Sequence, residues 1–286
     1  MHGNNGAETH VLLIECADEK GLVHKITGAL FRNNHNIVAN AEFVDSATRK
    51  FFMRTEFSGA LEKGKLLKEL ESILPKGSEI KIKIAEERKK RIVVFATKEH
   101  HCLGDLLLRN FSGDLNAEIL AVISNRKDLK NLTEKFGVKY FFIGDEGKPT
   151  EKHEAEILSA LKPLNPDFIV LAKYMKVFSG GFVSKYAGRV VNIHHSFLPA
   201  FAGANPYNQA FERGVKIIGA TAHFITKNLD AGPIIVQGTI PVDHSYSSAD
   251  LSSAGKEIER TVLAKALKLV FEDRVFVSGN KTVIFG

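Results

Sequence analysis

The first 85 residues show two alternating spacings of hydrophobic positions. In two stretches apolar residues recur every three or four positions, as on an amphipathic helix, and in four others every second position, as on a half-buried strand. Their order predicts a ferredoxin-like βαββαβ sandwich. The predicted strands are Val11–Cys16, Ile37–Phe43, Phe51–Phe57 and Ile80–Ile84, and the helices carry Leu22, Ile26 and Leu30, then Leu66, Leu67, Leu70 and Ile73.

From Arg91 onwards, short apolar runs alternate with amphipathic stretches. Strands covered on both faces are continuously apolar, so this pattern predicts a Rossmann-like, mostly parallel α/β sheet. A long helix over 251–271 and a terminal hairpin over 275–285 complete the chain. The other predicted strands are Ile92–Thr97, Ala117–Ser124, Tyr140–Ile143, Phe168–Tyr174, Arg189–His194 and Lys216–Thr226, and the helices are Glu154–Leu164 and Tyr207–Arg213.

We therefore predict two domains, residues 1–85 and 92–286, joined by a linker over 86–91. A chain of 286 residues is long enough for each domain to bury its own core. The linker contains the basic run Arg88–Arg91, which we interpret as solvated rather than as a nucleic-acid patch. A net charge of +6 suits an anionic small substrate equally well.

Composition argues against a membrane or secreted protein. The apolar runs are far shorter than the roughly 18 residues of a membrane helix. The first ten residues contain neither a cationic nor an apolar segment of a signal peptide, and the only cysteines are Cys16 and Cys102. We expect a cytoplasmic protein with no membrane and no nucleic-acid partner.

Three polar residues suggest a catalytic site. Asn192 and His194 are two positions apart on a predicted strand, so their side chains point to the same face. Ligands bind at the carboxyl ends of parallel strands, and Asp230, in a Gly-containing turn after the next strand, can reach the same crevice. A carboxamide, an imidazole and a carboxylate are candidates for an acyl-type reaction.

Four ordered motifs support this interpretation. They are NIHHSFLPAF from Asn192, GANPY from Gly203, IGATAHFI from Ile218 and LDAGPIIVQ from Leu229. Together they resemble the folate-dependent formyltransferase family over roughly residues 91–270, and the resemblance implies that Asn192, His194 and Asp230 are catalytic.

The stretch VLAKYMKVFS, from Val170 to Ser179, resembles the folate pocket of the same family. The resemblance implies that main chain around 174–177 and 229–231 holds the pterin. The expected substrate-binding residues are Tyr174, Met175, Lys176, Val177, Ile193, Leu229 and Ala231, with His101 on the acceptor side.

The N-terminal pattern resembles an ACT domain over about 75 residues, with Asp18 to Gly21 as its ligand loop. This resemblance implies an amino-acid effector at Asp18 and Gly21, and pairing of copies into a homodimer or homotetramer. The alternative for Asp18 is an ordinary helix N-cap. The effector, the direction of its regulation and the size of the oligomer stay open.

Members of the formyltransferase family differ in the formyl acceptor. Some pass the group to an amine, as on glycinamide ribonucleotide, some to methionyl-tRNA, and the deformylases, which carry an ACT domain, pass it to water. The ACT-like start, the short C-terminus and His195, at a position where the transferases usually have Pro, favour hydrolysis of 10-formyltetrahydrofolate to tetrahydrofolate and formate. The alternatives are an amine-dependent formyltransferase and an inactive amino-acid sensor.

The loop after the first strand of the second domain supports hydrolysis on physical grounds. Phosphate binds to backbone amides of Gly-rich loops at helix N-termini, but this loop is bulky and contains Glu99. His101 and Cys102 either fill the acceptor side, leaving space for water, or simply pack at a helix start. The roles of His100 and His195 stay open, as does the metabolic use of the products, free tetrahydrofolate or formate for purine biosynthesis.

The reaction needs no cofactor in this interpretation. We expect Asn192 to donate to the oxyanion, His194 to protonate the leaving aryl nitrogen, and Asp230 to orient water, accept its proton and hold His194. His195 and Ser196 are supporting candidates. The chain has no C-x-x-C or H-E-x-x-H spacing, so we expect no metal site despite its neighbouring histidines.

Overall fold

The computed structural model describes residues 8–75, 80–85, 88–199 and 206–286, which fall into two compact units. Unit 1 contains Met1–Arg88, and unit 2 contains Lys89–Glu272. Unit 1 also includes Asp273–Phe276 and Val283–Gly286, and unit 2 includes Val277–Thr282.

The units differ from the predicted domains at two places. Strand β5 (Lys90–Ala96) begins inside the expected linker 86–91 and pairs with the next strand, so the last two linker residues belong to the sheet. Residues 86 and 87 lie outside the described residues. The segments after Glu272 that belong to unit 1 were expected in the second domain, because sequence spacing does not reveal which unit a returning segment joins.

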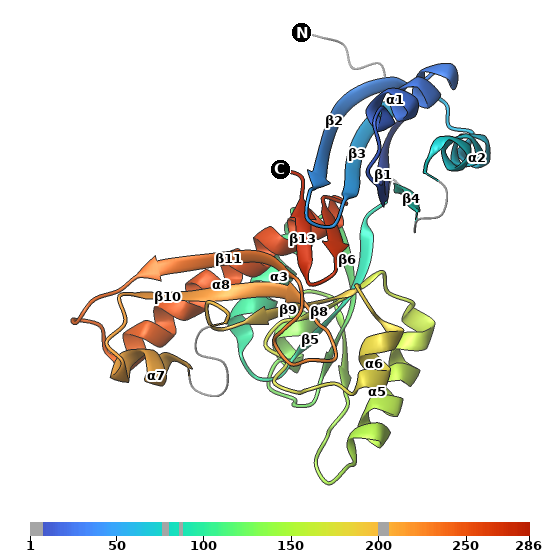
Figure 1. The fold of residues 1–286 in the computed structure, drawn as a ribbon. Coiled ribbons are helices and arrows are strands. Elements are labelled where there is room, and N and C mark those ends of the chain that lie inside the picture. Colours follow the sequence, from blue (N-terminus) through green and yellow to red (C-terminus); the bar gives the residue numbers. More distant parts are fainter. Residues whose placement is uncertain (1–7, 76–79, 86–87, 200–205) are drawn as a thin grey trace. The chain divides into compact units, whose positions relative to one another are not determined.

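Unit 1 has the predicted ferredoxin-like architecture (Figure 1). Its four-stranded sheet has the order β2-β3-β1-β4, and all neighbouring strands are antiparallel. The elements are β1 (Thr9–Ala17), α1 (Leu22–Arg32), β2 (Asn36–Asp45), β3 (Lys50–Ser58), α2 (Lys63–Ile73) and β4 (Lys81–Ala85).

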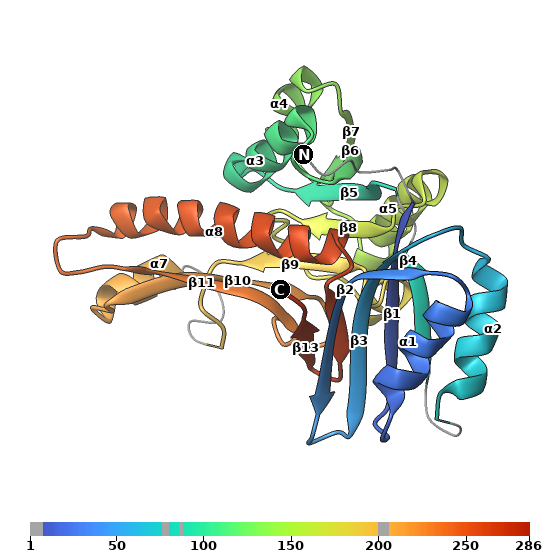
Figure 2. The same cartoon turned by 90° about the horizontal axis from the view of Figure 1, so that it is seen from above.

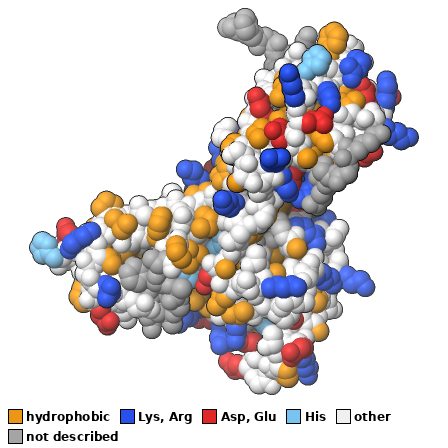
Figure 3. Space-filling view, viewed as in Figure 1, with side chains coloured by type: hydrophobic (Ala, Val, Ile, Leu, Met, Phe, Trp, Pro, Cys, Tyr) orange, Lys and Arg blue, Asp and Glu red, His pale blue; other side chains and the backbone are white. Residues whose placement is uncertain are grey.

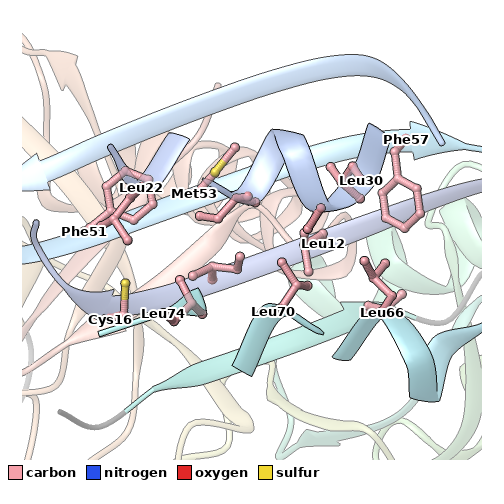
Figure 4. Close-up of a cluster of buried hydrophobic side chains, with 14 residues drawn as sticks. Leu12, Cys16, Leu22, Leu30, Phe51, Met53, Phe57, Leu66, Leu70 and Leu74 are labelled. Carbon is pink, nitrogen blue, oxygen red and sulfur yellow. The ribbon is translucent and has the colours of Figure 1, made fainter. Parts of the chain in front are cut away.

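The core of unit 1 lies between the two helices and one face of this sheet. Figure 4 shows Leu22 of α1 beside Phe51 at one end of the cluster and Leu30 of α1 beside Phe57 at the other, and Leu66 and Leu70 of α2 belong to the same cluster. The periodicities that predicted these elements therefore mark buried faces. Edge strand β2 is the exception, because its apolar residues Val38, Phe43 and Val44 are exposed.

The turn between β1 and α1 places Gly21, not Asp18, at the N-cap of α1. Gly21 has φ 89°, a left-handed conformation that glycine adopts without steric cost. Asp18 is exposed, and its backbone N–H donates to the Arg49 carbonyl. The N-cap interpretation of Asp18 is therefore wrong, whereas a ligand role for Asp18 and Gly21 stays a prediction.

Unit 2 has a seven-stranded sheet of order β11-β10-β9-β8-β5-β6-β7. The five strands from β9 to β7 are parallel, and β10 and β11 are antiparallel additions, which confirms the mostly parallel prediction. The remaining strands are β6 (Ala117–Ser124), β7 (Lys139–Phe142), β8 (Phe168–Leu171), β9 (Val190–His194), β10 (Ile217–Phe224) and β11 (Ile234–Pro241).

Helices cover both faces of this sheet. The crossover β5-α3-β6 moves toward the β7 edge of the sheet, and β7-α5-β8 moves back in the opposite direction past β6 and β5. Right-handed connections therefore place α3 and α5 on opposite faces. Helix α8 packs beside α3 and lies along β9, β10 and β11 (Figure 2). The helices are α3 (His100–Ser112), α4 (Lys130–Lys135), α5 (Thr150–Leu164), α6 (Gly180–Lys185), α7 (Pro206–Glu212) and α8 (Ser248–Phe271).

The chain ends in the predicted hairpin of β12 (Val275–Ser278) and β13 (Lys281–Ile284), which turns at Gly279. On the face in Figure 3, basic and acidic side chains are interspersed. Within the described residues, every helix is too short or too polar to cross a membrane.

Candidate active site

A cavity of about 300 Å³ lies where β8 and β9 end, bounded by the loop after β10. The reversal of strand order between β5 and β8 opens a crevice at this edge of the sheet. The cavity is lined by Leu171, Lys173, Tyr174, Met175, Lys176, Val177, Phe178, Val183, Asn192, Ile193, His194, His195, His223, Ile225, Thr226, Lys227, Asn228, Leu229 and Asp230.

The three predicted catalytic side chains converge in this cavity. Asn192 and His194 both line it from β9, as their alternation predicted. The His194 Nδ1 atom lies 3.3 Å from Asp230 Oδ1. Segments separated by more than thirty positions thus supply a carboxamide, an imidazole and a carboxylate to one pocket.

Asp230 reaches the pocket by a route that the sequence did not predict. Strand β10 is antiparallel to β9, so its carboxyl end does not point to the catalytic edge. Instead, the following loop folds back along β10, where Phe224 N–H donates to the Pro233 carbonyl. A Cβ on Gly232 would lie 1.8 Å from the Phe224 oxygen, so only glycine permits this approach.

His223 is a fourth member of the site. Its Nδ1–H donates to the Phe224 carbonyl at 2.9 Å, which leaves Nε2 to accept from the Asn192 amide nitrogen at 3.2 Å. Burial lowers the pKa of His223, which favours this neutral form. In the sequence, His223 resembles a core residue of an apolar strand, and only its pairing opposite Asn192 reveals its role.

Asp230 and His194 form the second hydrogen-bonded pair of the site. The hydrogen bond from His194 lowers the pKa of Asp230, which therefore stays a carboxylate. Asp230 accepts from Nδ1–H of His194, and the opposite ring atom, Nε2, is buried without a partner among the described residues. Since His194 lines the cavity, this nitrogen is a candidate for contact with a substrate.

The predicted folate residues divide into two groups. Tyr174, Met175, Lys176, Val177, Ile193 and Leu229 line the cavity, whereas Ala231 and His101 do not. Ala231 precedes the glycine at which the loop turns back, and His101 is buried in α3.

Three apolar residues that line the cavity, which we call its apolar wall, are exposed to solvent, as is frequent in ligand-binding grooves. Met175, Val177 and Leu229 are 58%, 65% and 68% exposed. Tyr174 is different, because its side chain is buried and its ring packs against Phe95 in the core.

Buried polar contacts fix the segment that carries this wall. The Met175 N–H donates to Thr97 Oγ1 at 3.2 Å, and Ser179 N–H donates to Glu154. Lys176 forms an ion pair with Asp145. Burial raises the pKa of Asp145, but hydrogen bonds from Lys176, Arg126 and Asn125 outweigh it and hold that pKa below its usual range.

His101 joins a buried ionic cluster instead of the pocket wall. We use "Glu259 cluster" for Glu259, His101, Lys173 and Tyr207. His101 Nε2, Lys173 Nζ and Tyr207 Oη lie 2.7, 3.2 and 2.6 Å from the Glu259 carboxylate. Burial raises the pKa of Glu259, but these three donors outweigh it and lower the pKa to about 2.

Cys102 lies beside this cluster, and burial raises the pKa of its thiol. Its sulfur and the donor atoms of His101 and Glu259 all lie within 4.8 Å of one another. A metal ion there would have to compete with the Lys173 ammonium on the same carboxylate. The absence of a metal site stays a prediction.

His195 lines the pocket next to His194, with ring centroids 4.9 Å apart. Burial, Lys173 and His194 lower the pKa of His195 to about 4. Ser196 is buried, and its carbonyl accepts from Thr221. Residues 200–205 of the motifs NIHHSFLPAF and GANPY lie outside the described residues.

Comparison with known proteins identifies similar chains. Residues 90–267 match the family described as Formyl transferase. A formyltetrahydrofolate deformylase from Haemophilus influenzae is 48% identical over 277 residues, which cover 97% of this chain and 99% of that protein.

Solved structures of similar proteins also match this chain. The crystal structure of a formyltetrahydrofolate deformylase from Pseudomonas syringae pv. tomato matches with a TM-score of 0.92 at 38% identity, over 99% of this chain and 96% of that one. Glycinamide ribonucleotide transformylase 1 from Symbiobacterium toebii matches with a TM-score of 0.66 at 29% identity, over 70% of this chain and 96% of that one.

Proposed function

Since this chain belongs to the formyltetrahydrofolate deformylases of the formyl transferase family, which hydrolyse 10-formyltetrahydrofolate, we propose that Asn192, His194 and Asp230 catalyse that hydrolysis. The observation that carries the assignment is the meeting of these three side chains in one cavity. The products are tetrahydrofolate and formate.

The substrate lies with its pterin against the exposed apolar wall of Met175, Val177 and Leu229. Main chain around 174–177 and 229–231 is proposed to hold the pterin, and the Met175 N–H and the Tyr174 carbonyl are themselves fixed by hydrogen bonds to Thr97 and to the Lys176 N–H. The formyl carbon is then placed between Asn192 and His194. Apolar walls with a few convergent polar groups are typical of small-molecule sites.

Hydrolysis begins with attack of water on the formyl carbon. The second amide hydrogen of Asn192, the first being bonded to His223, donates to the developing oxyanion. Asp230 orients the water and accepts its proton. The imidazolium of His194, stabilised by Asp230, then protonates the departing aryl nitrogen through Nε2, and the C–N bond breaks.

These groups supply an oxyanion donor, a base and an acid, so the reaction as proposed requires no cofactor. Unit 1 is proposed to bind an amino-acid effector near Asp18 and Gly21, and to pair with a second copy in a homodimer or homotetramer. We place the protein in the cytoplasm, a reducing compartment that suits its two buried free thiols, Cys16 and Cys102.

The direct test is to incubate the purified protein with 10-formyltetrahydrofolate alone and to measure formate and tetrahydrofolate. We expect equimolar release of both. Formate production that depends on an added amine would contradict the proposal, and so would binding of folate without turnover. Addition of single amino acids to the same assay tests the effector role of unit 1.

A further inference from the structure

Lys173 belongs both to the active-site cavity and to the buried Glu259 cluster. It lines the cavity with Asn192 and His194, and its ammonium lies 3.2 Å from the Glu259 carboxylate. Its side chain is only 7% exposed. Lysine is seldom buried to this degree unless it is paired, so the Glu259 carboxylate is what keeps Lys173 in place.

The backbone of Lys173 is strained. Its φ is 64°, in the left-handed region that glycine adopts freely and that other residues occupy at a cost. Such strain persists only where the surrounding structure enforces it, and it is frequent at functional sites. A glycine would relieve the strain, but it would leave the space of the lysine side chain empty.

The cluster behind Lys173 is tightly packed. Tyr207, whose hydroxyl bonds to Glu259, is seated on Gly255 of α8, where an added Cβ would lie 2.1 Å from the Tyr207 oxygen. Glu259 itself is 1% exposed and accepts from three donors. The carboxylate therefore has little freedom to release Lys173.

If the apolar wall holds the pterin as proposed, an attacking nucleophile enters among the polar lining residues, and Lys173 and His195 are two of these. We infer that Lys173, fixed by Glu259, is a specificity-determining residue that excludes amine nucleophiles from the formyl carbon and leaves space for water. The inference rests on the proposed hydrolysis and identifies the residue that separates it from formyl transfer.

Removal of the lysine side chain opens a route to transfer. In that reaction the amine nitrogen forms a bond to the formyl carbon, and the bond between this carbon and the folate nitrogen breaks. The proton lost by the amine passes to the folate nitrogen. The attacking form of an amine is uncharged, and the Lys173 ammonium is paired with Glu259, so the exclusion in the native protein is steric.

The test measures two products in one mixture. Wild-type protein and the Lys173→Gly variant are incubated with 10-formyltetrahydrofolate and glycinamide, and N-formylglycinamide and formate are quantified after subtraction of an enzyme-free blank. We expect the ratio of N-formylglycinamide to formate to rise at least about tenfold in Lys173→Gly, the scale of discrimination that a steric contact provides. Both products are made by the same folded molecules, so the ratio of N-formylglycinamide to formate does not depend on how much of the variant is folded.

Two further variants complete the design. The double variant Lys173→Gly with Glu259→Gln leaves no unpaired buried carboxylate, so it remains informative if the single variant folds poorly. Lys176→Gly is the matched control, because Lys176 also lines the pocket but pairs with Asp145 instead.

A higher ratio in both Lys173 variants and not in Lys176→Gly supports the inference. An unchanged ratio in both, or an equal rise in Lys176→Gly, overturns it. Wild-type protein that releases no formate would instead contradict the proposed function, so the two failures are distinguishable.

Discussion

Asn192 is oriented by a neutral histidine rather than by the solvent. Because His223 Nδ1–H is committed to the Phe224 carbonyl, Nε2 accepts one amide hydrogen of Asn192 and fixes which way the carboxamide faces. An oxyanion donor that is already oriented requires no reorganisation during the reaction. This arrangement makes the role of Asn192 separable from substrate binding.

Replacement of Asn192 by alanine should therefore lower kcat by about a hundredfold to a thousandfold, with little change in KM. Met175→Ala is the matched comparison, because Met175 belongs to the exposed apolar wall and should mainly raise KM. Steady-state kinetics on both variants check the division. A variant of either residue that lowers kcat and raises KM by similar factors would contradict this division.

His195 should make the stability of the protein depend on pH. Its pKa is about 4 in the folded chain, compared with 6.5 for an unperturbed histidine. Between these values the unfolded chain binds a proton that the folded chain does not, so stability decreases as pH falls from 6.5 to about 4. Below that window, both states are protonated and the loss is complete.

His195→Gln should reduce this acid loss of unfolding free energy by on the order of 2 kcal/mol, allowing for partial screening. Chemical denaturation at several pH values between neutrality and about 4.5 measures the difference. His100→Gln is the control, because His100 is exposed at the start of α3. The same pH dependence in wild type and in His195→Gln would refute the assignment.

At the scale of elements, the site depends on strand directions and helix faces that the sequence reveals unevenly. The alternation of Asn192 and His194 on β9 could be predicted, because period two is unambiguous on a short strand. The antiparallel direction of β10 could not, since an apolar strand has the same pattern in either direction. His223 was missed for that reason.

Helix α8 shows a similar limit. Its apolar stripe predicted the helix, but Glu259 lies on the buried face between Val262 and Leu251 of the same helix. A glutamate at such a position looks like solvent-facing charge until its partners are known. His101 and Lys173 come from other elements, at the start of α3 and after β8, so only the fold brings the donors together.

Gly255→Ala in α8 tests how tightly this cluster is packed. The new Cβ would lie 2.1 to 2.4 Å from three atoms of Tyr207, so the ring would have to move and abandon its hydrogen bond to Glu259. We expect a loss of about 3 kcal/mol in unfolding free energy, although alanine is the better helix former.

Gly104→Ala in α3 is the matched control, because a Cβ there meets nothing within 4 Å. It should stabilise the protein by roughly 0.5 to 1 kcal/mol, the usual gain from glycine to alanine inside a helix. Denaturant titration of both variants measures whether the unfolding free energy falls in Gly255→Ala and rises in Gly104→Ala. A stabilised Gly255→Ala variant would show that Tyr207 is not held as described.

In the molecule as a whole, the candidate active site lies in unit 2, whereas parts of the C-terminal segment after Glu272 belong to unit 1. Every residue that lines the cavity lies in unit 2. The segment from Asp273 to Phe276 belongs to unit 1, where the Phe276 ring lies 5.6 Å from Phe52 and Lys83 pairs with Asp273 at 2.7 Å. Removal of residues 1–88 should therefore preserve the site but take away the contacts that this segment makes with Phe52 and Lys83.

A chain that starts at Lys89 should keep kcat and KM for 10-formyltetrahydrofolate within about twofold of the full-length values, because a unit with its own core can fold alone. It should also aggregate more readily, since Phe276 loses its contact with the Phe52 ring and keeps that with Phe285. Phe276→Ser in the shortened chain should restore solubility without altering kinetics. A large loss of kcat in the shortened, soluble chain would mean that unit 1 takes part in catalysis, for example by assembling copies into the active form.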